Sequence, residues 1–390
     1  MSRPHIGALR NTVPLLAIEF LDEFVFGIRE AAWPMIRTDL ALDYAQIGLL
    51  LGIPSVVSSL VEPVLGILGD VWRRRLLILG GGAVFAVTLL LTALSHTFLA
   101  LLTAFMLFYP ASGAFVTLSQ ATLMDADAAR HEQNMARWTF AGSLGVVVGP
   151  LAYGAAARIG LSWREPFVLS AGLTLILLAI ASRYRFTNGR SKPKETGFKT
   201  GVMEAVHALQ RSEVLRWLTL LQFSDLVLDI LLGFLALYLV DVGDATPLQA
   251  GAAVAVWAGV GLLGGLLVIP LLTRVRGLVY LRFSALVELV LLPAFLLTSP
   301  VWVKLVLLAL LGFFNAGWYS VLMAQLYSAM PGRSGTVMTV SNVFGLVGGL
   351  IPLGLGLAAE RFGLEVTMWF LLLGPIALLM GVPRSRGWSS

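Results

Sequence analysis

The second half of this sequence repeats the first at a fixed offset of 203 residues. The register holds without a gap from the first apolar segment to the fifth, and polar residues recur along with apolar ones. The matching pairs include Asp22 with Asp225, Gln46 with Gln249, Gly48 with Gly251, Arg73 with Arg276, Arg130 with Arg333 and Gly160 with Gly363. A repeat of this length predicts two copies of one membrane-embedded unit, with a binding site between them.

The composition supports a membrane protein. Hydrophobic residues make up 58% of the chain, charged residues only 13%, and the mean hydropathy is +0.86. This leaves too little polar surface for a water-soluble domain, so the lipid bilayer is an expected partner. The net charge of +5 does not indicate nucleic acid, because membrane proteins gather basic residues in cytoplasmic loops. The absence of cysteine excludes disulfides and cysteine-ligated metals.

Twelve apolar runs are each long enough to cross a bilayer as a helix, which takes roughly 20 residues. They lie near residues 12–36, 45–68, 76–94, 98–124, 136–157, 165–186, 214–240, 248–272, 278–297, 303–329, 335–359 and 365–383. Backbone amides have no water to bond inside lipid, so continuous runs of this length must be helical. We therefore predict an all-α membrane protein of twelve transmembrane helices in two pseudo-symmetric six-helix bundles, residues 1–186 and 214–390, joined by a cytoplasmic linker at 187–213.

The basic residues predict the orientation. With the amino terminus in the cytoplasm, only a few of the 27 Lys and Arg fall outside. These are Arg37, Arg158, Arg164, Lys304 and Arg361, and Arg29 alone lies within a span. We therefore expect both termini in the cytoplasm and a location in the cell (inner) membrane. The basic tail before residue 12 has no small-residue cleavage site, so we expect no removable signal peptide.

A glycine, an acid and a basic cluster stand together between the second and third runs. They are Gly66, Asp70, Arg73, Arg74 and Arg75. In a twelve-run chain with a half-length repeat, this pattern resembles the loop signature of the major facilitator superfamily. The resemblance covers the whole chain and implies a monomeric transporter that opens alternately to the two sides of the membrane.

Asp70 has a physical role to play at this position. Its carboxylate would face the amino-terminal end of the eleventh span, whose dipole and free amides attract an anion. Arg130, at the cytoplasmic end of the fourth span, would complete an ion-pair network. We expect this gating motif to close the inner side. The alternative is that Asp70 only balances the arginines beside it.

The fifth run carries Gly145, Gly149, Pro150 and Gly154. This spacing is similar to the superfamily's antiporter motif, although Tyr153 stands where that motif has a glycine. The glycines allow neighbouring helices to touch backbone to backbone, and the proline allows a bend. We interpret this antiporter-like motif first as a close-packed surface that moves during transport, and second as a marker of antiport.

The charged residues of the membrane concentrate in the first run. Glu19, Asp22, Glu23, Arg29 and Glu30 fall within about 120° of one another on a helix. Charges at bilayer depth are costly, so a cluster of them indicates function, and one arginine cannot neutralise four acids. The alternative, that Arg29 neutralises acids to hold the fold, explains part of the set.

The seventh run adds Asp225 and Asp229, which lie one turn apart. In the superfamily's fold, spans 1, 4, 7 and 10 line the central cavity, so the resemblance places these acids across from the first run. It also places Gln120, Asn315, Trp318 and Tyr319 in the cavity. Like charges crowded in a low-dielectric site favour protonation, so these acids are candidates for proton coupling, with Asp22 ranked first.

We expect a secondary active transporter that exports a small molecule in exchange for protons, without a cofactor, a metal or enzymatic activity. All four histidines lie outside the spans, so carboxylates would carry the protons. The segments Leu21–Glu23 and Tyr44–Gly48 resemble the fosmidomycin-resistance branch. Alternatives are a proton-coupled importer of a small polar or cationic solute, a lipid flippase, and a transporter-like sensor. A membrane-bound enzyme is disfavoured because no nucleophile and base can be placed together.

Overall fold

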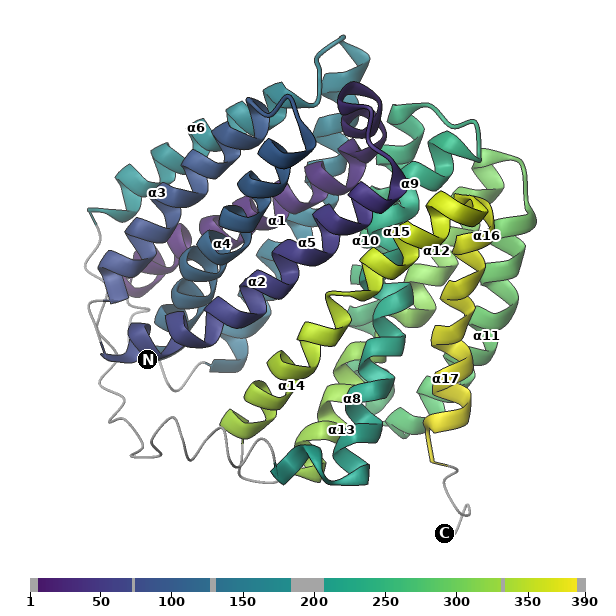
Figure 1. The fold of residues 1–390 in the computed structure, drawn as a ribbon. Helices are drawn as coiled ribbons and strands as arrows, with labels where there is room; N and C mark the ends of the chain where they lie inside the picture. The colour runs from purple at the N-terminus through teal and green to yellow at the C-terminus, as the bar shows by residue number, and fades with distance from the viewer. Residues whose placement is uncertain (1–5, 72–73, 127–130, 184–206, 331–333, 384–390) are drawn as a thin grey trace.

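A computed structural model describes residues 6–71, 74–126, 131–183, 207–330 and 334–383 of the protein. Throughout these ranges the protein is built from helices (Figure 1). The first repeat gives α1 (Ile6–Leu40), α2 (Tyr44–Val71), α3 (Arg74–Ala93), α4 (Phe98–Ala126), α5 (His131–Arg158) and α6 (Arg164–Ala181). The second gives α8 (Ser212–Asp225), η2 (Leu226–Ile230), α9 (Leu231–Asp241), α10 (Pro247–Leu272), α11 (Gly277–Leu297), α12 (Val301–Asn315), α13 (Trp318–Ala329), α14 (Ser334–Gly348), α15 (Ile351–Phe362), α16 (Leu364–Thr367), η3 (Met368–Leu372) and α17 (Leu373–Gly381).

The described helices account for the twelve predicted spans. Eleven helical segments are long and apolar enough to cross a membrane. The remaining expected span is α1, which has 35 residues and therefore ample length, but carries a cluster of charged residues in its middle. The all-helical membrane fold is therefore confirmed. The boundaries of the linker stay a prediction, because residues 184–206 lie outside the described ranges.

Several spans of the second repeat are interrupted, which the sequence did not predict. Span 7 contains the π-helical turn η2 between α8 and α9, and span 10 breaks between α12 and α13. At the second break, the Tyr280 hydroxyl donates to the carbonyl of Phe314 at 2.7 Å and accepts from the amide of Gly317 at 3.1 Å. A side chain from α11 thus satisfies backbone groups that the break leaves without helical partners.

Two matching capping boxes explain part of the repeat. Asp43 precedes α2, where its carboxylate accepts from the amide of Gln46 at 2.6 Å, and the Gln46 side chain accepts from the amide of Asp43 at 3.1 Å. Thr246 and Gln249 make the same reciprocal pair before α10, at 3.3 and 2.8 Å. Such pairs satisfy amides that a helix start leaves unbonded. Glutamine therefore recurs at the third position of both helices because its side chain caps the start of each helix.

A second matching pair turns the chain. Gly160 follows α5 and Gly363 follows α15, with φ of 82° and 84° respectively. This left-handed region strongly favours glycine, which has no Cβ. The two repeats therefore use the same residue to turn at the end of the fifth span in each unit.

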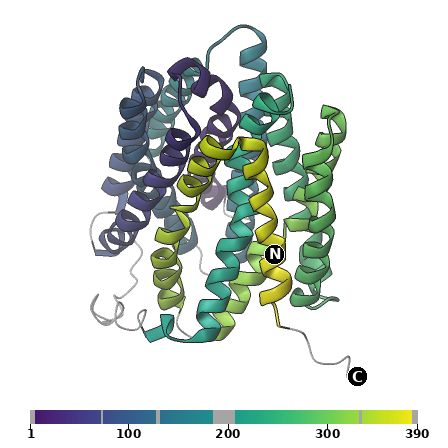
Figure 2. The same ribbon diagram turned by 45° about the vertical axis from the view of Figure 1, so that its right-hand side comes forward.

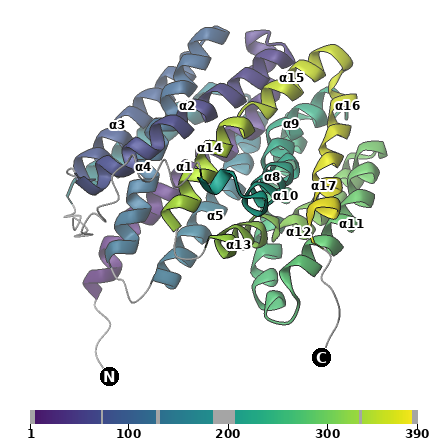
Figure 3. The ribbon, with the colours of Figure 1, turned by 60° about the horizontal axis from the view of Figure 1, so that its bottom comes forward.

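The two repeats pack against each other along two equivalent helix pairs, α2 with α15 and α5 with α10. Figure 1, and the turned views in Figures 2 and 3, show α2 running beside α14 and α15. A Cβ added to Gly48 in α2 would lie 2.6 Å from the carbonyl oxygen of Pro352. A Cβ added to Gly251, its repeat mate in α10, would lie 3.1 Å from the carbonyl oxygen of Pro150. Glycine is thus needed at both contacts because the partner backbone approaches closely.

Polar contacts join the two repeats at one end of the molecule, which we call the tied end. There Arg37, near the end of α1, pairs with Asp241 at the end of α9, with 3.0 Å between Nη1 and Oδ2. The Tyr44 hydroxyl donates to the same Asp241 oxygen at 2.9 Å, and the Tyr44 amide donates to Glu360 at 3.0 Å. Within the described residues, all hydrogen bonds and ion pairs between the repeats lie at this end.

Candidate functional site

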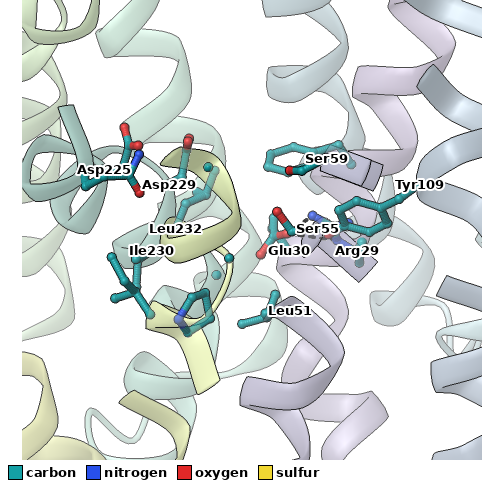
Figure 4. A pocket seen from close by; sticks show the side chains of 18 of the residues that line it. Arg29, Glu30, Leu51, Ser55, Ser59, Tyr109, Asp225, Asp229, Ile230 and Leu232 are labelled. Atoms are coloured by element: carbon teal, nitrogen blue, oxygen red, sulfur yellow. Dashed lines mark hydrogen bonds and ion pairs between the residues drawn. The ribbon is translucent and has the colours of Figure 1, made fainter. Parts of the chain in front are cut away.

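A cavity of about 590 Å³ lies between the two repeats. The first repeat contributes Glu23, Phe26, Arg29, Glu30, Leu51, Ser55, Ser59, Tyr109 and Val146 to its lining. The second contributes Gln222, Asp225, Asp229, Ile230, Leu232, Gly233, Trp257, Gly345, Gly348, Gly349, Ile351 and Pro352. Figure 4 shows the two walls, with Arg29, Glu30 and Tyr109 on one side and Asp225 and Asp229 on the other. The structure therefore brings together five of the predicted site residues, which are Glu23, Arg29, Glu30, Asp225 and Asp229.

The wall of the first repeat holds a compensated cation. Arg29 donates through Nε and Nη2 to one oxygen of Glu30, at 2.9 and 2.5 Å, and through Nη1 to the Tyr109 hydroxyl at 2.6 Å. The other Glu30 oxygen accepts from the Trp33 indole at 3.2 Å. The rings of Phe26 and Tyr109 lie 4.7 and 5.2 Å from the guanidinium carbon. Arg29 therefore neutralises Glu30, as the structural interpretation of this arginine required, and makes no ion pair with Glu19, Asp22 or Glu23.

The wall of the second repeat holds two acids without partners. Asp225 ends α8 and Asp229 lies within η2, so the π-helical turn separates the two carboxylates. Within the described residues, neither accepts a hydrogen bond or joins an ion pair, although both line the cavity. π-Helical turns often occur at functional sites. This one changes the register of span 7 between its two acids.

The other acids of α1 take different positions. Glu23 lines the cavity. Asp22 is outside the described lining, and its carboxylate accepts from the Ser112 hydroxyl of α4 at 2.7 Å. Glu19 is buried against α5, where a Cβ added to Gly142 would lie 2.5 Å from its carboxylate. The acidic stripe of α1 thus spreads over the cavity, α4 and α5, because a stripe about 120° wide faces more than one neighbour.

Besides Glu19 and Asp22, four more residues predicted for the cavity are outside its described lining. They are Gln120, Asn315, Trp318 and Tyr319. Trp318 is fully buried and donates to the Ser284 hydroxyl of α11 at 2.7 Å. Gln120 faces α5, with its amide 3.6 Å from the sulfur of Met135, and Asn315 is buried at the end of α12. The break in span 10 separates Asn315 from Trp318, so these two residues do not lie on one continuous helix.

Sequence reasoning missed several lining residues, including Tyr109, Ser55, Ser59 and Trp257. Two of these have a signal in the sequence. Ser55 and Ser59 are polar and lie one turn apart on α2, in a span that is mostly apolar. They were overlooked because only spans 1, 4, 7 and 10 were expected in the cavity, whereas α2 and the break before α15 also reach it.

The antiporter-like motif faces two neighbours. Gly145 and Gly149 contact the α1 backbone near Phe24, inside the first repeat. The ring of Pro150 also packs against α1, at Gly27, whereas its carbonyl oxygen and Gly154 approach α10, where a Cβ on Gly154 would lie 2.9 Å from the Leu248 side chain. Only this second part of the motif lies between the repeats. The first part packs α5 onto the acid-bearing helix α1.

The gating motif is only partly described. Gly66 and Asp70 belong to the last turns of α2, but the Asp70 side chain, Arg73 and Arg130 lie outside the described residues. Arg74 is buried, and Arg75 donates to the carbonyl of Ser182 at the end of the first repeat. The predicted ion-pair network around Asp70 therefore stays a prediction.

Two further acids lie away from the cavity. Glu62 in α2 accepts from the Ser58 hydroxyl at 2.7 Å. Glu288 in α11 is fully buried, and neither of its carboxylate oxygens has a hydrogen-bond partner among the described residues. The same residues contain no His, Asp and Glu cluster that could hold a metal ion.

Comparison with known proteins places these observations in a family. The family model described as Major Facilitator Superfamily matches residues 15–353. An uncharacterised MFS-type transporter of Yersinia pestis is 26% identical over 60% of this chain, and the fosmidomycin resistance protein of Escherichia coli (strain K12) is 28% identical over 45%. The matches span 60% and 44% of those two relatives.

Solved structures share the fold at lower identity. A bacterial homolog of the human lysosomal transporter Spinster, in an inward-facing and unoccupied conformation, has a TM-score of 0.76 and 18% identity, with 98% of this chain and 96% of that chain covered. The nucleoside transporter NupG has a TM-score of 0.77 and 15% identity, with 95% and 98% covered. Together with the spans, the repeat and the cavity, these matches show that the chain belongs to the Major Facilitator Superfamily and has the fold of a secondary transporter.

Proposed function

We propose that this transporter exports a small molecule in exchange for protons. The observation that carries the proposal is a set of three carboxylates that line the cavity and have no hydrogen-bond or ion-pair partner among the described residues: Glu23 from the first repeat, and Asp225 and Asp229 from the second. A proton and a substrate that both need the same carboxylates compete for them. Such competition couples the two movements, because each species then leaves the site to the other.

The contacts of Arg29 leave these three carboxylates available to a proton or a substrate. Its hydrogen bonds among the described residues go to Glu30 and Tyr109, and it makes no direct contact with the other cavity acids there. Like charges close together in a site of low dielectric constant favour binding of a proton. Glu23, Asp225 and Asp229 are therefore the groups we assign to proton binding, while the Arg29–Glu30 pair holds α1 to α4.

The arrangement of the repeats supports alternating access. If the bias of Lys and Arg places the amino terminus in the cytoplasm, the tied end with Arg37 and Asp241 lies outside. The conformation described above is then closed to the outside by polar contacts between α1, α2, α9 and α15. In this view, proton binding and substrate release accompany the breaking and re-forming of those contacts.

The export direction rests on a relative. The Escherichia coli protein is a fosmidomycin resistance protein, and removal of a toxic compound from the cell is one way to give resistance. The shared region covers less than half of either chain. We extend the direction of transport to this chain as part of the proposal, and we do not extend the compound.

The test uses inverted membrane vesicles with an acidic interior, in which protons leave when an exporter takes up its substrate. Candidate substrates are first selected as compounds that raise the thermal stability of the purified protein, since a ligand of the native state stabilises it. Such a compound should collapse the proton gradient in vesicles with the wild-type protein. Glu23→Gln should abolish this response, and Glu62→Gln should retain it as the matched control.

Three results would contradict the proposal. Uptake driven by a sodium gradient and insensitive to pH would remove proton coupling. Movement of the compound with protons, and not against them, would show an importer. Full proton exchange in Glu23→Gln combined with Asp225→Asn and Asp229→Asn would show that these carboxylates do not bind the coupled proton.

A further inference from the structure

The only basic residue in the described lining of the cavity is unsuited to binding an anion. Arg29 is 5% exposed and its partner Glu30 only 2%. Glu30 already balances the charge of the guanidinium, so an anionic substrate gains little net attraction from it, and an anion that displaced Glu30 would leave a buried carboxylate without its counter-charge. Removing one partner from a buried ion pair is strongly unfavourable. Arg29 is therefore a structural part of the cavity wall, and its positive charge is not available to attract a substrate.

The acids across the cavity have the opposite character. Asp225 and Asp229 line the cavity and have no partner among the described residues, and Glu23 extends the same negative surface from α1. Even with one proton bound, this set retains negative charge. A cavity lined by one sign of charge attracts ligands of the opposite sign.

A third observation concerns the apolar part of the cavity and the uncharged groups that would bind there. Trp257 lines the same cavity beside the apolar residues Ile230, Leu232 and Leu51. The indole N–H of Trp257 is buried and has no hydrogen-bond partner within the described residues. Buried donors are normally satisfied, so a ligand with an acceptor near this ring would supply the missing partner.

We propose that the substrates are small organic cations that carry an apolar ring and a hydrogen-bond acceptor. The positive centre lies between Asp225 and Asp229, at the π-helical turn, and the ring lies against Trp257 and Ile230. The cavity of about 590 Å³ suits such a molecule, since ligand pockets commonly measure about 300 to 1,000 Å³. This inference rests on the proposed transport through this cavity and names the class of compound that it carries.

The test compares three probes of one shape. They are the cation 4-benzoyl-N-methylpyridinium, the neutral 4-benzoylpyridine N-oxide and the anion 4-benzoylbenzoate. Calorimetric titration of the purified full-length protein, in one buffer and without any gradient, should show binding of the cation. The neutral and anionic probes should bind at least about tenfold more weakly.

Two variants assign the contacts. Asp225→Asn combined with Asp229→Asn should weaken binding of the cation about tenfold, while Glu62→Gln should leave it unchanged. Trp257→Phe keeps an aromatic ring but removes the N–H, and should weaken binding about fivefold. The cation 4-benzyl-N-methylpyridinium, which lacks the carbonyl acceptor, should bind equally to wild type and Trp257→Phe.

The proposal is overturned if the cation does not bind, if 4-benzoylbenzoate binds as tightly, or if the paired aspartate variant keeps full affinity for the cation. If Trp257→Phe lost equal affinity for both cationic probes, the hydrogen bond from the Trp257 N–H would no longer be part of the proposal. Binding at equilibrium needs no proton gradient, so these results are separate from the vesicle test. A failure here leaves proton-driven export of another substrate standing, and a failure of proton coupling leaves cation binding standing.

Discussion

α1 and the segment α8–η2–α9 occupy equivalent places in the two repeats, but they present their acids differently. In α1, Asp22 is held by Ser112 and Glu30 by Arg29, so two carboxylates of this helix are structural. In span 7, Asp225 occupies the place that corresponds to Asp22, yet it lines the cavity without a partner. The repeat therefore preserves the position of an acid without preserving its surroundings, and surroundings decide what a carboxylate can bind.

The largest effect should come from Arg29→Met. Glu30 would be left as a buried carboxylate without its counter-charge, which costs roughly 3 to 5 kcal/mol of folding free energy. Denaturant or thermal unfolding of the purified protein measures this loss. Combining Arg29→Met with Glu30→Met should recover most of the stability, because apolar replacement of both partners is often nearly neutral. A tolerated single substitution would mean that α1 does not depend on this pair.

The second test compares the repeat mates directly. Asp225→Asn should weaken substrate binding by about threefold, because it removes one of the two aspartates that face the cavity and leaves Asp229 in place. Asp22→Asn should alter binding less, since the Asp22 carboxylate is bonded to α4. Titration of both variants with the same ligand gives the ratio of their dissociation constants. A larger loss in Asp22→Asn would restore the ranking drawn from the sequence and place the substrate nearer α4.

A smaller effect on stability is expected when the partner of Asp22 is removed. Ser112→Ala deletes a hydrogen bond to a carboxylate, which contributes about 1 kcal/mol to stability. The change should appear as a lower melting temperature in the detergent-solubilised protein. Ser112→Thr keeps the hydroxyl and serves as the control. An equal loss in both variants would indicate packing at this site and not the hydrogen bond.

The smallest effect concerns the tied end, where Arg37 of α1 meets Asp241 of α9. Both side chains are partly exposed, so Asp241→Asn should cost only about 0.2 to 1 kcal/mol. That is enough to change the populations of two nearly balanced conformations severalfold. Because the chain has no cysteine, single cysteines placed beside the tied end would report its opening by faster labelling. Unchanged labelling would show that this contact does not hold the repeats together.

The sequence predicted the fold well because hydrophobic length and repetition act over whole helices. The twelve spans, the family and the matching of Gln46 with Gln249 all follow from patterns of this kind, and the capping boxes supply a physical cause for the last. The charged residues of α1 were equally visible, because charges are rare in apolar runs. What could be read from the sequence was therefore the elements and the presence of a polar site.

The arrangement of that site depended on helix interruptions, which leave little trace in the sequence. The offset of 203 residues continues through span 7, so η2 does not arise from an inserted residue. The break at Gly317 depends on Tyr280 from another helix. For the same reason the positions of Trp318 and Asn315 could not be derived, since a residue's direction beyond a break is set by its tertiary neighbours.

The glycine contacts between α2 and α15 have a consequence for the speed of the transport cycle. Where Gly48 meets Pro352 and Gly356, the two surfaces are largely backbone. Long side chains that interlock across an interface must leave their rotamers and find them again each time it opens and closes, which adds an entropic cost to each cycle. A backbone surface has no such rotamers to reset. The contact can therefore separate and re-form as a smooth rigid surface, and the resistance to opening is left mainly to the few polar contacts of the tied end.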